Sequence, residues 1–177
     1  QSGNNEILAA MNRRYTREQY LEKVRKLRQA IPEIGLTTDL IVSFPGETEA
    51  QFEDTVSLVR EVGYDAAFTF IYSPREGTVA AGLPGQIAPE VSSRRIESLI
   101  QAVEASTATV HQHMLGREEQ VLVEGLSKRD DHQVSGKGTR GITVTLDGTA
   151  GDIGHIIPVT ITSSAVNTLR GERKARS

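Results

Sequence analysis

The stretch LTTDLIVSFPGETEAQFEDT, residues 36–55, contains the pattern that decides the fold. Its first part, Leu36 to Phe44, is an almost continuous apolar run rich in β-branched residues, which is typical of a strand covered on both faces. The run stops at a Pro-Gly pair, and Thr48 with Gln51 then forms a capping box, the usual signal for the start of a helix. Apolar residues recur at helical spacing up to Gly63, so the stretch predicts a buried strand followed directly by a helix.

The sequence on either side repeats this alternation. A helix is predicted over Thr16 to Ala30 from its capping box and its apolar spacing. Ala66 to Ser73 (AAFTFIYS) alternates as a strand does, and Pro89 to Gly116 has the apolar face of a long helix. Strands and helices that alternate over short connections are the signature of parallel βα units, in a barrel or in a doubly wound sheet.

A different pattern starts at Arg117. Short strand-like segments follow one another, with glycine-containing turns and no helical spacing: Gln120 to Glu124, Ile142 to Leu146, Ile156 to Thr162 and Asn167 to Arg173. About sixty residues of this kind suggest a small barrel, similar in size to oligonucleotide-binding modules. The predicted fold is therefore α/β, a partial βα barrel with parallel strands over residues 1–116, followed by a small all-β barrel domain over residues 117–177.

Composition excludes several classes of protein. With 37% hydrophobic and 24% charged residues the chain is globular rather than disordered, and no apolar run is long enough for a membrane helix, so we expect a cytoplasmic protein without a membrane partner. The absence of cysteine excludes disulfides, thiolate zinc sites and iron–sulfur ligation by this chain. Up to Gly116 there are 11 Lys and Arg against 15 Asp and Glu, and after it 9 against 8, so the second domain is the better neighbour for a polyanion.

Five stretches cover nearly the whole chain: QSG at Gln1 to Gly3, AMNRRYTREQY at Ala10 to Tyr20, residues 36–55, FTFIYSPREGT at Phe68 to Thr78, and VLVEGLSKRD at Val121 to Asp130. In this order and spacing they resemble the MiaB-type family of radical S-adenosylmethionine (SAM) methylthiotransferases, which act on dimethylallyladenosine in tRNA.

The resemblance implies an enzyme of three parts: a domain with an auxiliary iron–sulfur cluster, a radical SAM barrel, and a C-terminal TRAM domain that binds RNA. Because the cysteines that bind the family's cluster are absent, this chain would be the end of the barrel plus TRAM, and its opening on Gln1 without an initiator methionine is that expected of a fragment. SAM and two 4Fe-4S clusters would serve the parent enzyme, with neither cluster ligated by this chain. We therefore expect no catalytic residue here, no turnover by the chain alone, and a missing N-terminal part as its partner.

Barrel ligands lie at the carboxyl ends of strands, so the family's SAM pocket would use residues at those positions. Arg13 could pair with the cofactor carboxylate, or be a solvated charge before a helix. Asp39 is a carboxylate in an apolar strand, so it should have a partner: the cofactor, an arginine such as Arg13, or a structural salt bridge. Relatives usually have glycine at the position of Ser43. The full set of candidate SAM-binding residues is Gln1, Ser2, Arg13, Asp39, Ser43 and Tyr72.

RNA binding requires several cationic groups on one surface. The candidates are Arg75 in the first domain and, in the second, Lys128, Arg129, Lys137, Arg140 and Arg170. Ordinary solvated loops are the alternative interpretation. No metal site is predicted, because His132 has no second ligand at suitable spacing, and His111 and His113 are interpreted as surface residues on the long helix.

Other functions remain open from the sequence. The chain could be a stand-alone RNA-binding module, an assembly remnant that binds neither ligand, or part of a methylthiotransferase of the threonylcarbamoyladenosine or ribosomal-protein branch. Half a barrel would also leave an open strand edge, which predicts possible self-association.

Overall fold

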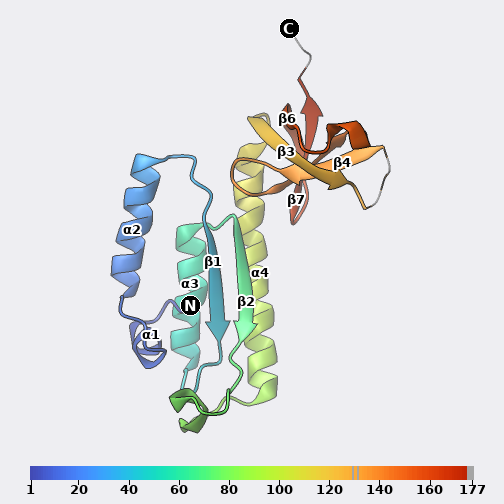
Figure 1. Ribbon diagram of the computed structural model, residues 1–177. Coiled ribbons are helices and arrows are strands. Elements are labelled where there is room, and N and C mark those ends of the chain that lie inside the picture. Colours follow the sequence, from blue (N-terminus) through green and yellow to red (C-terminus); the bar gives the residue numbers. More distant parts are fainter. Residues whose placement is uncertain (129, 131, 175–177) are drawn as a thin grey trace. The chain divides into compact units, whose positions relative to one another are not determined.

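Two compact units, Gln1–Ser106 and Thr107–Ser177, make up the computed structural model, which describes residues 1–128, 130 and 132–174 (Figure 1). The division falls within the long helix α4 (Pro89–Met114), whereas the sequence suggested a boundary after Gly116. The predicted fold class is confirmed, with parallel strands and helices first and a closed barrel of strands after them.

The first unit contains the predicted strand–helix alternation. Its other elements are α1 (Asn5–Ala10), α2 (Arg17–Ala30), β1 (Thr37–Val42), α3 (Glu49–Val62), β2 (Ala66–Ile71) and the 3-10 helix η1 (Val79–Gly82). Both capping boxes are present, at Thr16 and at Thr48, and Gly63 ends α3 in the left-handed conformation. The sequence did not predict α1, whose start is capped by the Asn4 side chain. β1 and β2 pair in parallel from Thr37 opposite Ala66 to Val42 opposite Ile71.

Only one face of this two-stranded sheet is covered. Leu40 and Val42 point into a core built with α3, α4 and Val24 of α2, whereas the opposite face leaves Phe68 66% and Phe70 50% exposed. The prediction of a strand covered on both faces is therefore wrong for this chain. The physical reason is that two strands cannot close a barrel, so the face that would point inward has nothing opposite it.

The second unit is a closed five-stranded barrel. Its elements are β3 (Glu118–Leu126), β4 (Gln133–Lys137), β5 (Thr143–Asp147), the 3-10 helix η2 (Ala150–Asp152), β6 (Ile156–Ser164) and β7 (Thr168–Arg173), in the order β3-β4-β5-β7-β6. All neighbours are antiparallel except β5 and β7. Valine, leucine and isoleucine side chains fill the interior, together with Met114 from the end of α4.

The sequence missed β4. Its residues QVSGK include one large apolar side chain, Val134, so the alternation is weak. Gly136 explains the composition, because a Cβ at this position would lie 2.0 Å from the Leu122 carbonyl oxygen of β3. The close approach of β3 and β4 therefore requires glycine at position 136, and this glycine weakens the strand pattern in the sequence.

His111 is buried rather than on the surface, contrary to the prediction. It is 1% exposed, and its Nδ1 lies 3.1 Å from the Ala165 carbonyl oxygen, because the turn between β6 and β7 covers this part of α4. In the part of the chain that is described, no helix combines the length and the apolar character needed to cross a membrane.

Candidate functional site

The carboxyl ends of β1 and β2 lie side by side. Val42 and Ile71 are register partners, and the Tyr72 N–H donates to the Val42 carbonyl oxygen at 2.9 Å. Just beyond, the Phe44 and Tyr72 rings meet edge to face with their centroids 5.1 Å apart. The residues that leave the two strands are therefore gathered at the edge where parallel βα units bind ligands.

Three buried polar atoms belong to residues at and just after these strand ends: Ser43 Oγ, Glu47 Oε1 and Tyr72 Oη. None of them has a hydrogen-bond partner within the described residues. A buried polar group without a partner costs about 1–3 kcal/mol, so folded proteins retain few of them without a reason. Three such atoms from residues at one edge of the sheet make this edge the candidate site for a polar ligand.

Ser43 has a strained backbone. Its φ is 63°, a left-handed conformation that glycine adopts easily and serine does not. The Ser43 N–H donates to Glu47 Oε2 at 2.7 Å, which fixes the turn after β1. A glycine at this position, which the resemblance implies for relatives, would adopt the same turn without strain.

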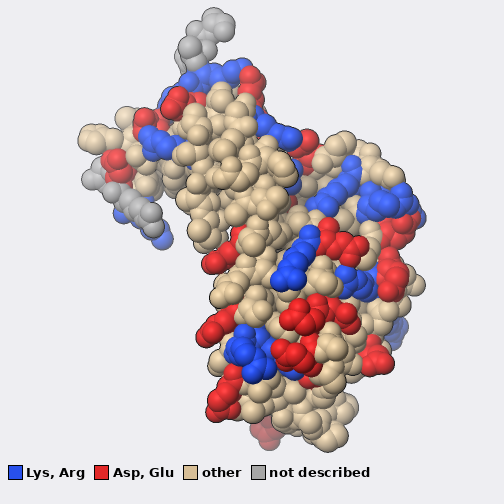
Figure 2. All heavy atoms as spheres, turned by 180° about the vertical axis from the view of Figure 1, so that it is seen from behind, with Lys and Arg blue, Asp and Glu red and all other residues tan. Residues whose placement is uncertain are grey.

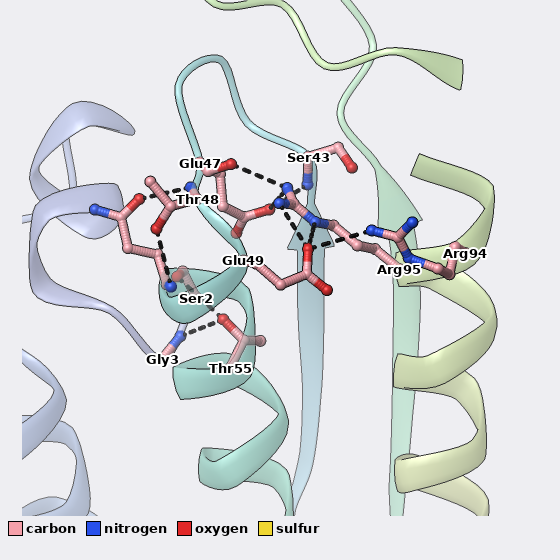
Figure 3. Close-up of polar contacts among 10 residues, drawn as sticks. Ser2, Gly3, Ser43, Glu47, Thr48, Glu49, Thr55, Arg94 and Arg95 are labelled. Atoms are coloured by element: carbon pink, nitrogen blue, oxygen red, sulfur yellow. Dashed lines mark hydrogen bonds and ion pairs between the residues drawn. The ribbon is translucent and has the colours of Figure 1, made fainter. Parts of the chain in front are cut away.

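A buried ion pair joins this turn to α4 (Figure 3). The side chains of Glu47 and Arg95 are 0% and 5% exposed, and Arg95 Nη1 lies 3.2 Å from Glu47 Oε2 and 3.1 Å from the Glu47 carbonyl oxygen. Arg95 also contacts Glu49 Oε2 at 3.1 Å and lies over the Phe52 ring. Burial raises the pKa of Glu47, and this effect exceeds the opposing effects of the Ser43 N–H and of Arg95.

The sequence did not single out this pair. Glu47 lies in the capped turn after the first predicted strand, and Arg95 lies in the predicted helix from Pro89 to Gly116, but neither was a candidate site residue. One signal was available, because Arg95, Leu99 and Ala102 recur at helical spacing and all three are buried. An arginine on the apolar face of a helix must have a partner.

The N-terminal residues pack against β1 and α3. The Ile41 N–H donates to the Gln1 carbonyl oxygen. Ser2 Oγ lies 3.3 Å from Thr55 Oγ1, and the Gly3 N–H donates to the same hydroxyl (Figure 3). Gln1 Oε1 accepts from the Tyr15 hydroxyl, and Gln1 and Ser2 line a small cavity of about 180 Å³. These hydrogen bonds anchor the N-terminal loop to the first unit. Contacts of Gln1 and Ser2 with SAM remain a prediction.

Arg13 and Asp39 are both exposed. The expectation that Asp39 needs a partner as a buried carboxylate is wrong, because its side chain lies on the uncovered face of β1, where water solvates it.

Two of the candidate RNA-binding cations, Lys137 and Arg170, lie far apart in the sequence but on strands that both pair with β5. Lys137 on β4 donates to Thr143 on β5 at 2.8 Å, and Arg170 on β7 pairs with Asp147 at 2.7 Å. Lys137 is the register partner of Thr143 and Arg170 of Thr145, so the two cations lie on either side of β5. Arg140 is in the turn between β4 and β5.

Two further candidates, Lys128 and Arg75, are exposed, and Arg129 lies outside the described residues. Figure 2 shows Lys and Arg interleaved with Asp and Glu on the face in view, rather than gathered in one field. Across the ranges 1–128, 130 and 132–174, no cluster of three or more His, Asp or Glu residues could hold a metal ion.

Comparison with known proteins agrees with the division of the chain into a βα part and a small barrel. Residues 1–59 match the model of the radical SAM superfamily, and residues 112–174 match the TRAM domain. Proteins named tRNA-2-methylthio-N(6)-dimethylallyladenosine synthase share 46% identity in Clostridium novyi, 48% in Oceanobacillus iheyensis and 51% in Trichlorobacter lovleyi, each over 97% of this chain. Over nearly its whole length the chain is thus similar to one part of the MiaB-type methylthiotransferases, and it carries a radical SAM and a TRAM region. It spans 38%, 33% and 39% of the length of these three relatives.

This similarity confirms the resemblance seen in the sequence. The relatives carry the dimethylallyladenosine name, and the match includes both a radical SAM and a TRAM region, so neither a stand-alone RNA-binding module nor another methylthiotransferase branch is favoured. Nothing supports self-association of the chain.

Proposed function

We propose that this chain is the C-terminal portion of an enzyme that adds a methylthio group to a dimethylallyl-type adenosine next to the anticodon of tRNA. The first unit supplies part of the SAM pocket, and the second binds the tRNA in the cytoplasm. The observation that carries this proposal is the similarity to tRNA-2-methylthio-N(6)-dimethylallyladenosine synthases over 97% of the chain. The three unpartnered buried polar atoms at the carboxyl ends of β1 and β2 support the SAM pocket.

The chemistry of this group fits SAM. An ionised carboxylate accepts hydrogen bonds and donates none, so Glu47 Oε1 suits an ammonium, an amine or a ribose hydroxyl as its partner. The hydroxyls of Ser43 and Tyr72 can donate as well as accept. Gln1, Ser2, Arg13 and Asp39 complete the proposed set. With the 4Fe-4S clusters of the parent enzyme, bound SAM supplies the radical chemistry that replaces a carbon–hydrogen bond of the adenine by a carbon–sulfur bond. This chain has no cysteine, so the upstream part must hold both clusters.

The tRNA contacts are proposed for the cations around β4, β5 and β7. Lys137, Arg140 and Arg170, with Lys128 and Arg129 before β4, would contact phosphates and position the RNA without reading its sequence. Arg75 follows β2 near the SAM edge and would contact a phosphate close to the modified nucleotide.

Filter binding of tRNA to this chain at two salt concentrations, with SAM titration of the full-length parent enzyme, tests the proposal. We expect the chain to retain tRNA at low salt, with affinity that falls steeply as salt rises. The parent enzyme should bind SAM and methylthiolate a tRNA that carries dimethylallyladenosine. Absence of tRNA binding at low salt, or of SAM binding to the parent with intact clusters, would refute it.

A further inference from the structure

The buried pair between Glu47 and Arg95 is an expensive way to join two segments. Placing both charges out of water requires good geometry to break even, and apolar side chains of similar volume would often hold the same contact equally well. The two residues lie 48 positions apart, one in the turn after β1 and one on α4. A charged pair at this place therefore needs an explanation beyond stability.

Arg95 is held in one orientation. Its Nη1 donates to the carbonyl and carboxylate oxygens of Glu47, its Nε donates to Glu49 Oε2 at 3.1 Å, and its guanidinium carbon lies 5.6 Å from the centre of the Phe52 ring. The planar fork thus fixes the Glu47 side chain from one side.

The two oxygens of the Glu47 carboxylate are used differently. Oε2 accepts from the Ser43 N–H and from Arg95, whereas Oε1 is buried and has no partner within the described residues. A carboxylate kept only for structure would be expected to use both oxygens. Its free oxygen belongs to the same group of unpartnered atoms as Ser43 Oγ and Tyr72 Oη.

We propose that Arg95 is a positioning residue of the SAM pocket: it holds Glu47 ionised and turned so that one oxygen fixes the Ser43 turn and the other accepts a hydrogen bond from an amino or hydroxyl group of the cofactor. This inference rests on the proposed function of the strand-end site. Without Arg95, burial and the neighbouring Glu49 would favour the protonated form of Glu47, while Arg94 contacts Glu49 rather than Glu47.

The test uses the full-length parent enzyme with reconstituted clusters and measures the SAM dissociation constant by equilibrium dialysis between pH 6 and pH 9, beside KM and kcat. Arg95→Met should weaken SAM binding about tenfold or more at pH 7 and raise KM with little change in kcat. Its affinity should recover as rising pH ionises Glu47. Arg95→Lys should restore part of the affinity. Arg94→Met, a neighbouring arginine whose side chain is 65% exposed, is the matched control and should behave as wild type.

A double variant, Arg95→Met with Glu47→Gln, distinguishes a positioning role of Arg95 in SAM binding from a purely structural role. It removes the unpaired buried charge, so thermal stability should return, but SAM affinity should remain low. Return of both stability and affinity in the double variant would overturn the inference, as would wild-type affinity in a well-folded Arg95→Met enzyme. Failure of the wild-type parent to bind SAM is a different result, because it refutes the proposed function itself.

Discussion

Ser43 combines two features that lower the stability of the fold, and it lies at the candidate site. Its left-handed backbone and its unpartnered hydroxyl are both unfavourable, and both occur where β1 delivers the chain to the candidate pocket. Strain of this kind is characteristic of functional sites, where the surrounding structure enforces it.

Replacing Ser43 by glycine should stabilise the chain. We expect the free energy of unfolding to rise by about 0.5–1 kcal/mol, since the relief of left-handed strain is partly offset by the greater freedom of glycine in the unfolded chain. Urea unfolding measures this. Ser43→Ala removes the hydroxyl and keeps the strained backbone, so it serves as the control. Equal stability of the alanine and glycine variants would show that the backbone is not strained.

Elements of the first unit are linked by buried polar contacts as well as by apolar packing. Tyr64, 1% exposed and just after α3, donates its hydroxyl hydrogen to the Tyr20 hydroxyl of α2 at 2.9 Å. Burial is the main cause that raises the pKa of Tyr64 well above its usual value, and the bond to Tyr20 adds to it. The phenol is thus strongly kept in its protonated form by the fold.

This contact predicts a loss of stability in alkali. Since the pKa is higher in the folded state, the contribution of Tyr64 is complete below about pH 10 and is lost as pH rises, because the unfolded chain releases the proton first. Tyr64→Phe should be less stable than wild type by about 1 kcal/mol at pH 8. The difference between the two proteins should shrink at pH 10.5, as measured by urea unfolding at both pH values. A difference that does not change with pH would contradict this account.

Sequence patterns predicted several elements from local chemistry, although the short helix α1, capped by Asn4, was missed. The capping boxes at Thr16 and Thr48 and the left-handed Gly63 are local signals, and the structure contains all three. β4 was missed because Gly136 is required by a neighbouring strand, and burial of His111 depends on the distant turn at Ala165. The helical spacing of Arg95 with Leu99 and Ala102 indicates that the arginine needs a partner, but only the folded chain shows that this partner is Glu47.

At the scale of the whole molecule, the uncovered face of the β1–β2 sheet is the main sign that the fold continues elsewhere. Phe68 and Phe70 are half or more exposed there, and the chain spans between 33% and 39% of its closely similar relatives. In a complete parallel barrel, this face would be covered by side chains from the other strands.

Phe68→Ser should therefore behave differently in two contexts. In this chain, where Phe68 is 66% exposed, the free energy of unfolding should change by no more than about 0.5 kcal/mol. In the full-length parent enzyme the same substitution should remove a buried aromatic ring and lower the melting temperature by several degrees, consistent with a loss of about 3 kcal/mol. Val79→Ser, at a site that is 87% exposed, is the control and should have little effect in either protein. Tolerance of Phe68→Ser in the full-length enzyme would refute burial of this face.

The reach of Arg95 from α4 to Glu47 also restricts how homologous genes can vary in length. One codon added between Arg95 and Leu99 would rotate the arginine by about 100° relative to the apolar stripe behind it, and its guanidinium would leave the carboxylate. Insertions and deletions during divergence should therefore accumulate in the exposed connection between Ser73 and Pro84 and be rare in this turn of α4.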